Sequence, residues 1–327
     1  MCTYGGTLTV IAATHKAPAA PHASPEGRYV RAERALWERH GVAVRNRLVN
    51  VEALGTTVRV QETGSGDPVL FIHGGPNAGS TFAPMVAAMP GVRSLVLDRP
   101  GCGLSAAVEH SRLPLRRLAP TVLASTLDGL GVDRVDVVAS SFGGAWSLWF
   151  ALAHPERVRR LVLLGAPAFV PGMLVPGFMR ALCTPVLGHL IAAMPPNLSG
   201  SRWIHRQMGH GAEVVESGIS PEYWAWGIRL MADTPTMAND VRIIRQVVAR
   251  GQVRPEVQFT PADLRALAVP TLLYWGTDDT FGGSELARST AALIPGSTLE
   301  LLPGGGHLPW LDDPARAARS ALTFLHG

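Results

Sequence analysis

Cysteine is scarce in this sequence of 327 residues, and its scarcity argues against disulfide-rich and zinc-binding proteins. Cys2, Cys102 and Cys183 are too few and too widely spaced to form a disulfide framework or a zinc site. No His-Glu-x-x-His segment, paired cysteines or acidic loop indicates a metal site either. We therefore predict a protein of a reducing compartment, the cytoplasm, that uses no metal and no other cofactor.

Lysine is almost absent, because Lys16 is the only one in the chain. The formal net charge of +4 therefore comes from arginines, and these are dispersed among acidic residues. Nucleic-acid-binding proteins concentrate Lys and Arg in clusters or stripes, and this chain has no such cluster. The pattern argues against a nucleic-acid partner and favours a small molecule. It leaves open whether the protein is a monomer or a homodimer.

A long uninterrupted apolar run is also missing. The longest uncharged stretches, residues 161–179 and 181–200, are each broken by several prolines and glycines. A membrane-spanning helix needs about 20 consecutive, mostly apolar residues. Residues 1–10 contain no basic segment of the kind that opens a signal peptide. We therefore expect neither stable membrane insertion nor export.

The N-terminal part of the chain differs in composition from the rest. Residues 1–27 are rich in Ala, Pro, Thr and His without any period, which is typical of a disordered leader. Residues 29–40 place apolar side chains among charged ones and predict a short amphipathic helix. We therefore assign residues 1–45 to a leader that carries one helix.

From there to the C-terminus, short apolar strands alternate with helical segments, except where prolines break up helical pieces between residues 170 and 261. Such alternation is typical of a doubly wound, mostly parallel sheet covered by helices. The predicted fold class is thus α/β, with core segments 46–169 and 262–327 and an inserted helical cap, or lid, over residues 170–261. The expected strands are residues 48–54, 56–62, 68–72, 94–97, 134–138, 160–164, 271–275 and 298–302, and a closing helix is expected over residues 314–325.

One hydroxyl stands where a buried strand turns abruptly into a helix. The strand over residues 134–138 is followed by an apolar, helix-forming segment, and Ser141 lies on the turn between them. So sharp a turn strains its central residue and requires small residues two positions to either side, here Ala139 and Gly143. Ser140 lacks this spacing, and we interpret it as a strand-end hydroxyl. Ser141 is therefore the candidate nucleophile.

A serine nucleophile needs a base within hydrogen-bond reach, and the base needs an acid that orients it. Asp279 lies just past the C-terminal end of one predicted strand, and His307 lies just past the end of the next. The C-terminal ends of parallel strands share one edge of the sheet, so we expect both side chains to meet Ser141 there. Asp278 competes with Asp279 as the acid, and His73 is a weaker candidate for the base.

Four separated motifs resemble the α/β-hydrolase family, and the resemblance extends from about Leu48 to the C-terminus. The motifs are His-Gly-Gly-Pro at residues 73–76, Asp-Arg-Pro-Gly-Cys-Gly at residues 98–103, the turn around Ser141, and Gly306-His307 with Pro309 and Asp312 following. The family orders its triad Ser, Asp, His along the chain. The resemblance thus implies a capped serine hydrolase with catalytic Ser141, Asp279 and His307, and Ala139 replaces the more common glycine.

The resemblance also implies an oxyanion hole, in which two backbone N–H groups hold the negative oxygen of a tetrahedral intermediate. By motif position these N–H groups belong to Gly75 and Phe142. The candidates for the substrate pocket are apolar and aromatic residues of the cap, whose alternative role is to hold the cap together. They are Trp203, Tyr223, Trp224, Trp226 and Met179.

The implied reaction is acyl transfer, and an ester of an apolar small molecule is the expected substrate because an alkoxide leaves more readily than an amine. A serine at the turn argues against the dehalogenase and epoxide-hydrolase branches, which resemble this chain elsewhere but use aspartate. Three alternatives stay open: a C–C bond hydrolase of ring-fission products, an aminopeptidase with a His-Gly-Gly-Pro loop, and a non-catalytic ligand receptor on the same fold.

Overall fold

The computed structural model describes residues 24–108, 114–249 and 251–327, and it is built on an eight-stranded sheet. The strand order is β1-β2-β4-β3-β5-β6-β9-β10. β2 is antiparallel to β1 and β4, whereas every pair from β4 to β10 is parallel. The predicted α/β class with a mostly parallel sheet is confirmed. The strands are β1 (Arg45–Val51), β2 (Thr56–Gly64), β3 (Asp67–Ile72), β4 (Val92–Leu97), β5 (Val135–Ser140), β6 (Val158–Leu164), β9 (Thr271–Gly276) and β10 (Thr298–Leu302).

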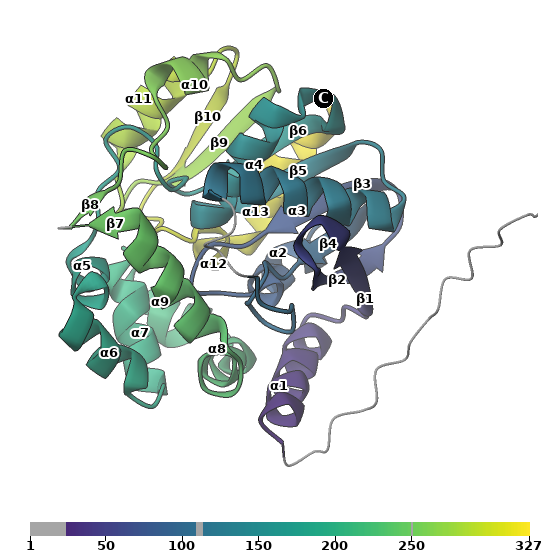
Figure 1. The fold of residues 1–327 in the computed structure, drawn as a ribbon. Helices are drawn as coiled ribbons and strands as arrows, with labels where there is room; N and C mark the ends of the chain where they lie inside the picture. Colours follow the sequence, from purple (N-terminus) through teal and green to yellow (C-terminus); the bar gives the residue numbers. More distant parts are fainter. Residues whose placement is uncertain (1–23, 109–113, 250) are drawn as a thin grey trace, which may run out of the picture.

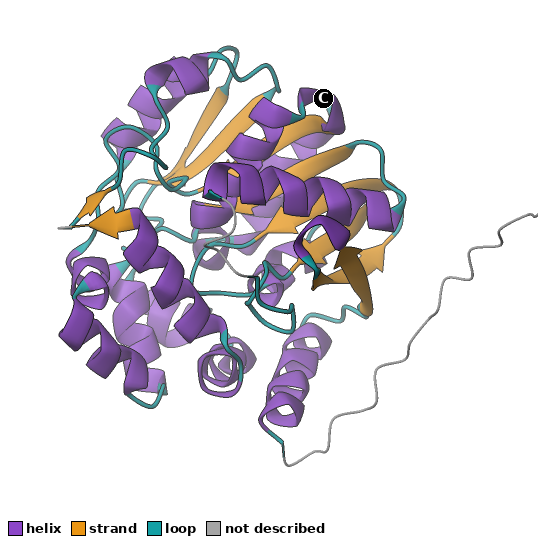
Figure 2. Cartoon of the chain, in the orientation of Figure 1, coloured by secondary structure: helices purple, strands orange, loops and turns teal. Residues whose placement is uncertain are grey.

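Helices cover both faces of this sheet (Figures 1 and 2). On β5, Val137 and Ala139 belong to the hydrophobic cluster that includes α3 and α4, whereas Val138 belongs to the cluster of α2 and α13. A strand buried on both faces is apolar throughout, and this explains why the inner strands are visible in the sequence. The core helices are α2 (Ala83–Ala87), α3 (Leu115–Leu130), α4 (Ser141–Ala153), α10 (Pro261–Arg265), α11 (Ser284–Leu293), α12 (Pro309–Asp312) and α13 (Pro314–His326).

Between β6 and β9 the chain leaves the sheet and forms a group of helices, which we call the helical insertion (residues 170–261). Figure 1 shows these helices gathered together beside the sheet. A two-stranded hairpin, which the sequence did not predict, closes this group. Its elements are α5 (Gly177–Cys183), α6 (Pro185–Ala193), α7 (Leu198–Gln207), a π-helical turn (Val214–Gly218), α8 (Pro221–Asp233), α9 (Thr236–Val247), β7 (Val248–Ala249) and β8 (Gln252–Val253).

Helix α1 (Pro25–Arg39) begins inside the stretch assigned to the leader. The Ser24 hydroxyl accepts a hydrogen bond from the Gly27 N–H, and Pro25 takes the first helical position, as is common at helix N-termini. α1 lies beside α8 of the helical insertion (Figure 1), and an Arg28–Asp233 ion pair of 2.6 Å joins them. The rest of the predicted leader, residues 1–23, lies outside the described residues.

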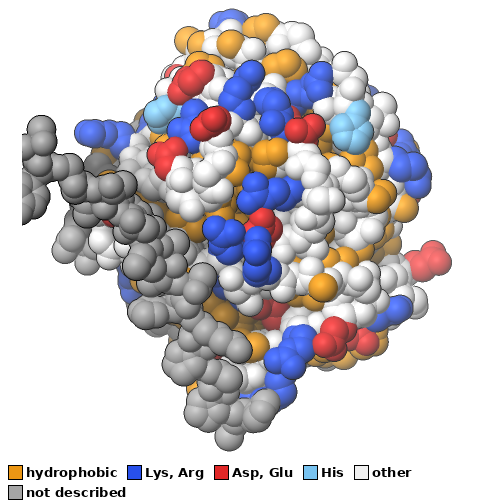
Figure 3. Space-filling model, turned by 90° about the vertical axis from the view of Figure 1, so that its right-hand side faces the viewer, with side chains coloured by type: hydrophobic (Ala, Val, Ile, Leu, Met, Phe, Trp, Pro, Cys, Tyr) orange, Lys and Arg blue, Asp and Glu red, His pale blue; other side chains and the backbone are white. Residues whose placement is uncertain are grey.

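Two of the exclusions drawn from composition can be compared with the structure. In the described part of the chain, no helix has the length and apolar character needed to cross a bilayer. On the face shown in Figure 3, basic and acidic side chains are interspersed with apolar and uncharged ones. The mixing of charges along the sequence is therefore also present on this surface.

Candidate active site

Ser141 lies at the junction of β5 and α4, in a backbone conformation that side chains rarely adopt. Its φ is +50°, in the left-handed region that costs non-glycine residues energy. The turn is close-packed, because a Cβ on Gly143 would lie 2.1 Å from the Ile72 carbonyl oxygen. A Cβ on Gly74 would likewise lie 2.9 Å from the Ser141 Cβ. Neighbouring glycines therefore permit the turn that presents the Ser141 hydroxyl.

Asp279 and His307 form a buried pair on the loops that follow β9 and β10. The His307 Nδ1 lies 3.0 Å and 2.9 Å from the two carboxylate oxygens of Asp279. The backbone N–H groups of Ala166 and Phe281 donate to the same carboxylate, each at 2.9 Å. These donors satisfy both oxygens of the buried acid and hold it in one orientation. The imidazole is held in turn, because the Phe281 ring stacks on it at 4.1 Å between centroids.

The loop after β6 links this pair to the serine turn. At one end, the Ala168 N–H donates to the Ser141 carbonyl oxygen at 2.9 Å. At the other end, the Ala166 N–H donates to Asp279, and Gly165 is packed so closely that a Cβ would lie 2.3 Å from the His307 carbonyl oxygen. Phe281, which stacks on His307, also lines the pocket that contains Ser141. The structure thus brings the three sequence-predicted residues to the carboxyl edge of the sheet.

The predicted oxyanion residues, Gly75 and Phe142, line this same pocket beside Ser141. His73, just before this loop, is fully buried, and burial followed by the charge of Arg99 holds its pKa well below the usual range. Its Nε2 accepts a hydrogen bond from the Arg99 backbone N–H at 3.0 Å. His73 is therefore a neutral brace of the loop and lies apart from the Asp279–His307 pair.

The pocket beside Ser141 is mainly apolar. Helix α9 contributes four side chains spaced three, four and seven residues apart, so they share one helix face. They are Asp240, Ile243, Ile244 and Val247. The sequence analysis singled out none of these four, although their spacing within an amphipathic segment was a usable signal.

Of the predicted pocket residues, the structure places Met179 in this pocket and the other four elsewhere. Trp203 is 51% exposed. Tyr223, Trp224 and Trp226 are buried, the Trp224 ring lies 4.7 Å from that of His205, and the Tyr223 hydroxyl hydrogen-bonds to Thr81 of the sheet core. These three aromatic residues are packing residues, and they share one hydrophobic cluster with residues of α1, α2 and α13.

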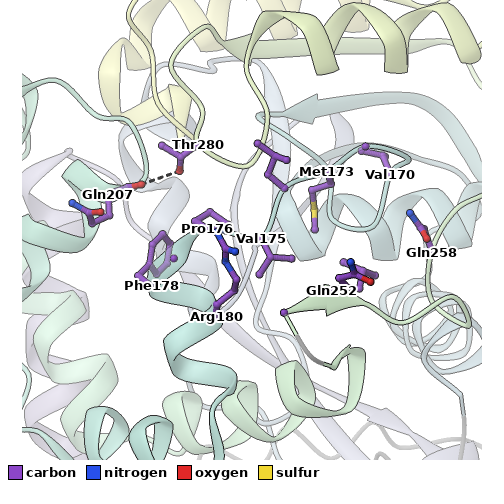
Figure 4. A pocket seen from close by; sticks show the side chains of 15 residues that line it. Val170, Met173, Val175, Pro176, Phe178, Arg180, Gln207, Gln252, Gln258 and Thr280 are labelled. Atoms are coloured by element: carbon purple, nitrogen blue, oxygen red, sulfur yellow. Dashed lines mark hydrogen bonds between the residues drawn. The ribbon is translucent and has the colours of Figure 1, made fainter.

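A wider groove opens next to the pocket and shares Met173 and Val175 with it. The cavity volume of the groove is about 770 Å³, against about 70 Å³ for the pocket. Figure 4 shows Arg180, Gln252 and Gln258 around this groove together with apolar side chains. The site therefore combines a small apolar pocket at Ser141 with a larger, more polar space outside it.

A strained serine at a strand-to-helix turn, with a buried Asp–His pair on the loops after β9 and β10, is an arrangement typical of the hydrolase class of α/β proteins. The family model of the alpha/beta hydrolase family matches residues 69–320. The chain belongs to this family, and the comparisons with its relatives support a hydrolase enzyme.

Two relatives illustrate the similarity in sequence. A 2-hydroxy-6-oxononadienedioate/2-hydroxy-6-oxononatrienedioate hydrolase from Paraburkholderia phymatum is 37% identical over 88% of this chain and 97% of its own. A 2-hydroxymuconate semialdehyde hydrolase from Pseudomonas putida is 27% identical over 84% of this chain and 92% of its own.

Solved structures share the fold at lower identity. A carboxylesterase from Bacillus subtilis superposes with a TM-score of 0.71 at 18% identity, over 92% of this chain and 98% of its own. A serine hydrolase involved in carbazole degradation superposes with a TM-score of 0.67 at 23% identity, over 87% of this chain and 99% of its own. At these identities the likeness concerns the fold alone.

Proposed function

We propose that this protein is a serine hydrolase in which Ser141 attacks a carbonyl carbon and forms an acyl-enzyme. The observation that supports it most directly is the buried Asp279–His307 pair, with both carboxylate oxygens engaged, on the sheet edge that carries Ser141. A carboxylate that is held by two backbone N–H groups and faces one nitrogen of an imidazole fixes the tautomer that a general base needs.

The chemistry follows from this tautomer. With Nδ1–H donated to Asp279, the lone pair of His307 lies on Nε2, which takes the Ser141 proton during attack. The backbone N–H groups of Gly75 and Phe142 hold the negative oxygen that forms. His307 returns the proton to the departing group, and a water molecule then repeats the sequence to release the acid. The helical insertion, in this proposal, covers the pocket as a cap.

For the substrate, we propose a C–C bond next to a ketone of the kind found in ring-fission products. The relatives in sequence support this choice, since their names specify conjugated oxo-acids as substrates. The dienol first takes a proton on the carbon next to the ketone and loses its hydroxyl proton, which gives the keto tautomer. After Ser141 adds to the ketone, the breaking bond leaves its electron pair on that carbon, where conjugation with the enone stabilises it, and the resulting dienolate takes up a proton. The small pocket would hold the acyl part, and the groove would hold the remainder with its carboxylate near Arg180.

A carboxylic ester is the second candidate, and the mainly apolar lining of the pocket favours it. Asp240 is the one charged side chain among the described residues that line the pocket at Ser141, and it is paired with Arg99 at 2.9 Å. An uncharged acyl chain would meet mainly apolar side chains there. A dienoate carboxylate would meet no cationic side chain among the described residues that line this pocket, so a C–C substrate must bind with that end outside it.

The test compares both substrate classes with one pair of variants. The purified protein is assayed on 2-hydroxy-6-oxo-dienoates by loss of their absorbance and on p-nitrophenyl esters of increasing acyl length. Ser141→Ala should lower kcat by at least about 10⁴-fold on whichever class is turned over, because the nucleophile is lost. The neighbouring Ser140→Ala is the matched control and should leave kcat within about twofold.

The outcomes separate the candidates. Faster turnover of the dienoates, as kcat/KM, supports the C–C hydrolase, whereas turnover of esters alone supports the second candidate. Turnover that survives Ser141→Ala in folded protein would remove Ser141 as the nucleophile. No turnover of either class by the wild type would favour the aminopeptidase or the receptor alternative.

A further inference from the structure

Arg99, on the loop after β4, is bonded to the segment that carries the proposed oxyanion residue. Its Nε donates to the His73 carbonyl oxygen at 3.1 Å, and its Nη2 donates to the Gly74 carbonyl oxygen at 2.9 Å. Its backbone N–H donates to the His73 ring at 3.0 Å. A planar guanidinium that binds two successive carbonyls fixes their direction. Gly75, the next residue, has its N–H in the same peptide unit as the Gly74 carbonyl.

Asp240 reaches this arginine from the helical insertion. Its Oδ2 lies 2.9 Å from the Arg99 Nη2, and the side chains are 3% and 0% exposed. Its Oδ1 accepts weaker hydrogen bonds from the Cys102 thiol at 3.4 Å and the Asn239 amide at 3.3 Å. The carboxylate also touches the oxyanion loop directly, because a Cβ on Gly75 would lie 2.3 Å from Oδ2.

The two charges depend on each other because both are out of water. Burial by itself lowers the pKa of Arg99, but the Asp240 carboxylate, together with Cys102 and Asp98, raises it above its ordinary value. Removing one partner of a buried pair leaves the other as an uncompensated charge. Without Asp240, the Arg99 guanidinium would be held from one side only, and its hydrogen bonds to the carbonyls of His73 and Gly74 would be less strictly fixed in direction.

We propose that Asp240 is a positioning residue that holds Arg99 in place, so that the guanidinium fixes the oxyanion loop and the direction of the Gly75 N–H. The helical insertion then helps to stabilise the transition state, in addition to forming part of the pocket wall. This inference rests on the proposed function, since it needs an oxyanion at that loop.

A purely architectural role predicts something different. The helical insertion has other polar links to the core, including His210 to Asp312 at 2.9 Å and Tyr223 to Thr81 at 2.8 Å. Losing Asp240 therefore should not detach it. A loose oxyanion loop lowers kcat and also lowers the affinity for an oxyanion mimic. A variant that is only slightly less stable keeps both quantities unchanged as long as it is folded.

The experiment uses Asp240→Asn in the full-length protein, with Asp233→Asn as the matched control. Asp233 is another buried carboxylate of the helical insertion, and it forms an ion pair with Arg28, which lies on α1 and away from the oxyanion loop. In Asp240→Asn we expect kcat to fall about 10- to 100-fold, short of the full loss of an oxyanion donor, with KM within about threefold. The inhibition constant of a trifluoromethyl ketone should rise by the factor by which kcat/KM falls. Asp233→Asn should change neither quantity more than about twofold.

Two results would overturn the inference. One is an Asp240→Asn enzyme that is folded and keeps wild-type kcat; the other is a lower kcat without weaker ketone inhibition. If Asp240→Asn does not accumulate as folded protein, Asp240→Glu keeps the charge while displacing it, and the same loss of kcat must appear at unchanged Tm. Failure of the proposed function is tested separately with a fluorophosphonate, which should label the wild-type protein but not the Ser141→Ala variant. If the wild type is not labelled, the proposed function fails; if it is labelled, the results for Asp240→Asn bear on the inference about Asp240 alone.

Discussion

At the scale of single residues, the histidines near the site differ by what surrounds each ring. His307 faces a carboxylate, whereas His73 and His205 face no acid and are buried. His205 lies on α7 against Trp224, and its Nδ1 hydrogen-bonds to the Ser201 carbonyl oxygen. Burial, followed by the nearby His210, lowers the pKa of His205 to about 3.

This shift predicts how stability changes with pH. Above about pH 6.5, the ordinary pKa of histidine, His205 is neutral in the folded and the unfolded chain. Between that pH and about 3 the unfolded chain takes up a proton that the folded protein does not, so stability is lost as pH falls. Each proton bound only by the unfolded chain lowers the free energy of unfolding by roughly 1.4 kcal/mol for every unit by which the pH falls.

We expect His205→Asn, which keeps a donor toward Ser201, to lessen the acid loss of stability by about 2 kcal/mol between pH 6.5 and 4.5. Urea unfolding at several pH values measures how the free energy of unfolding depends on pH. His326→Asn, at an exposed histidine, is the control for the loss of an imidazole. Equal pH dependence in wild type and His205→Asn would contradict the prediction.

At the scale of elements, α1 joins the sheet through one buried glutamate. Glu33 accepts hydrogen bonds from both terminal nitrogens of Arg59 on β2, at 2.6 Å and 2.7 Å, and from the Tyr29 hydroxyl at 2.7 Å. Burial alone would raise the pKa of Glu33, but Arg59 brings it below the usual value. The predicted amphipathic helix is thus held to the sheet by a buried ion pair as well as by its apolar side chains.

Glu33→Ala should cost about 3–5 kcal/mol of unfolding free energy, because it leaves Arg59 buried beside Asp98 with one fewer anion. Arg39→Ala on the same helix removes only an exposed pair with Glu222 and should cost less than about 1 kcal/mol. Urea unfolding of both variants provides the comparison. A loss below 1 kcal/mol for Glu33→Ala would show that α1 is held by its apolar face.

At the scale of the whole molecule, the helical insertion and the sheet core share buried contacts. Three contacts cross between them: the Arg99–Asp240 pair, the hydrogen bond between the Thr81 and Tyr223 hydroxyls, and the His307 backbone N–H donated to the Met208 carbonyl oxygen. Neither part can open without exposing groups that depend on the other. The molecule should therefore unfold as one cooperative unit.

We predict a single urea transition that coincides by far-UV circular dichroism and by tryptophan fluorescence. Tyr223→Phe removes one of the links and should move both curves together to lower urea. Separate midpoints in the wild type, with fluorescence changing first, would mean that the helical insertion unfolds alone.

Much of the sheet could be predicted because its signals are local. Residues 68–72 and 298–302 were expected as strands and are β3 and β10 almost to the residue, since apolar runs bounded by turn residues need no knowledge of neighbours. The closing helix was expected over residues 314–325 and is α13, and two aspartates, Asp312 and Asp313, precede it. Asp313 caps this helix, whereas Asp312 bonds to the Gly306 N–H and to His210, a partner that is remote in sequence.

The sequence by itself determined the α/β class, the turn at Ser141 and the order of the candidate triad, because each depends on spacing along the chain. Only the tertiary structure decided which apolar residues face the pocket and which residues brace the oxyanion loop. Asp240 lies beside Gly75 because α9 packs against the loops that follow β3 and β4, and that approach depends on packing between segments far apart in the chain.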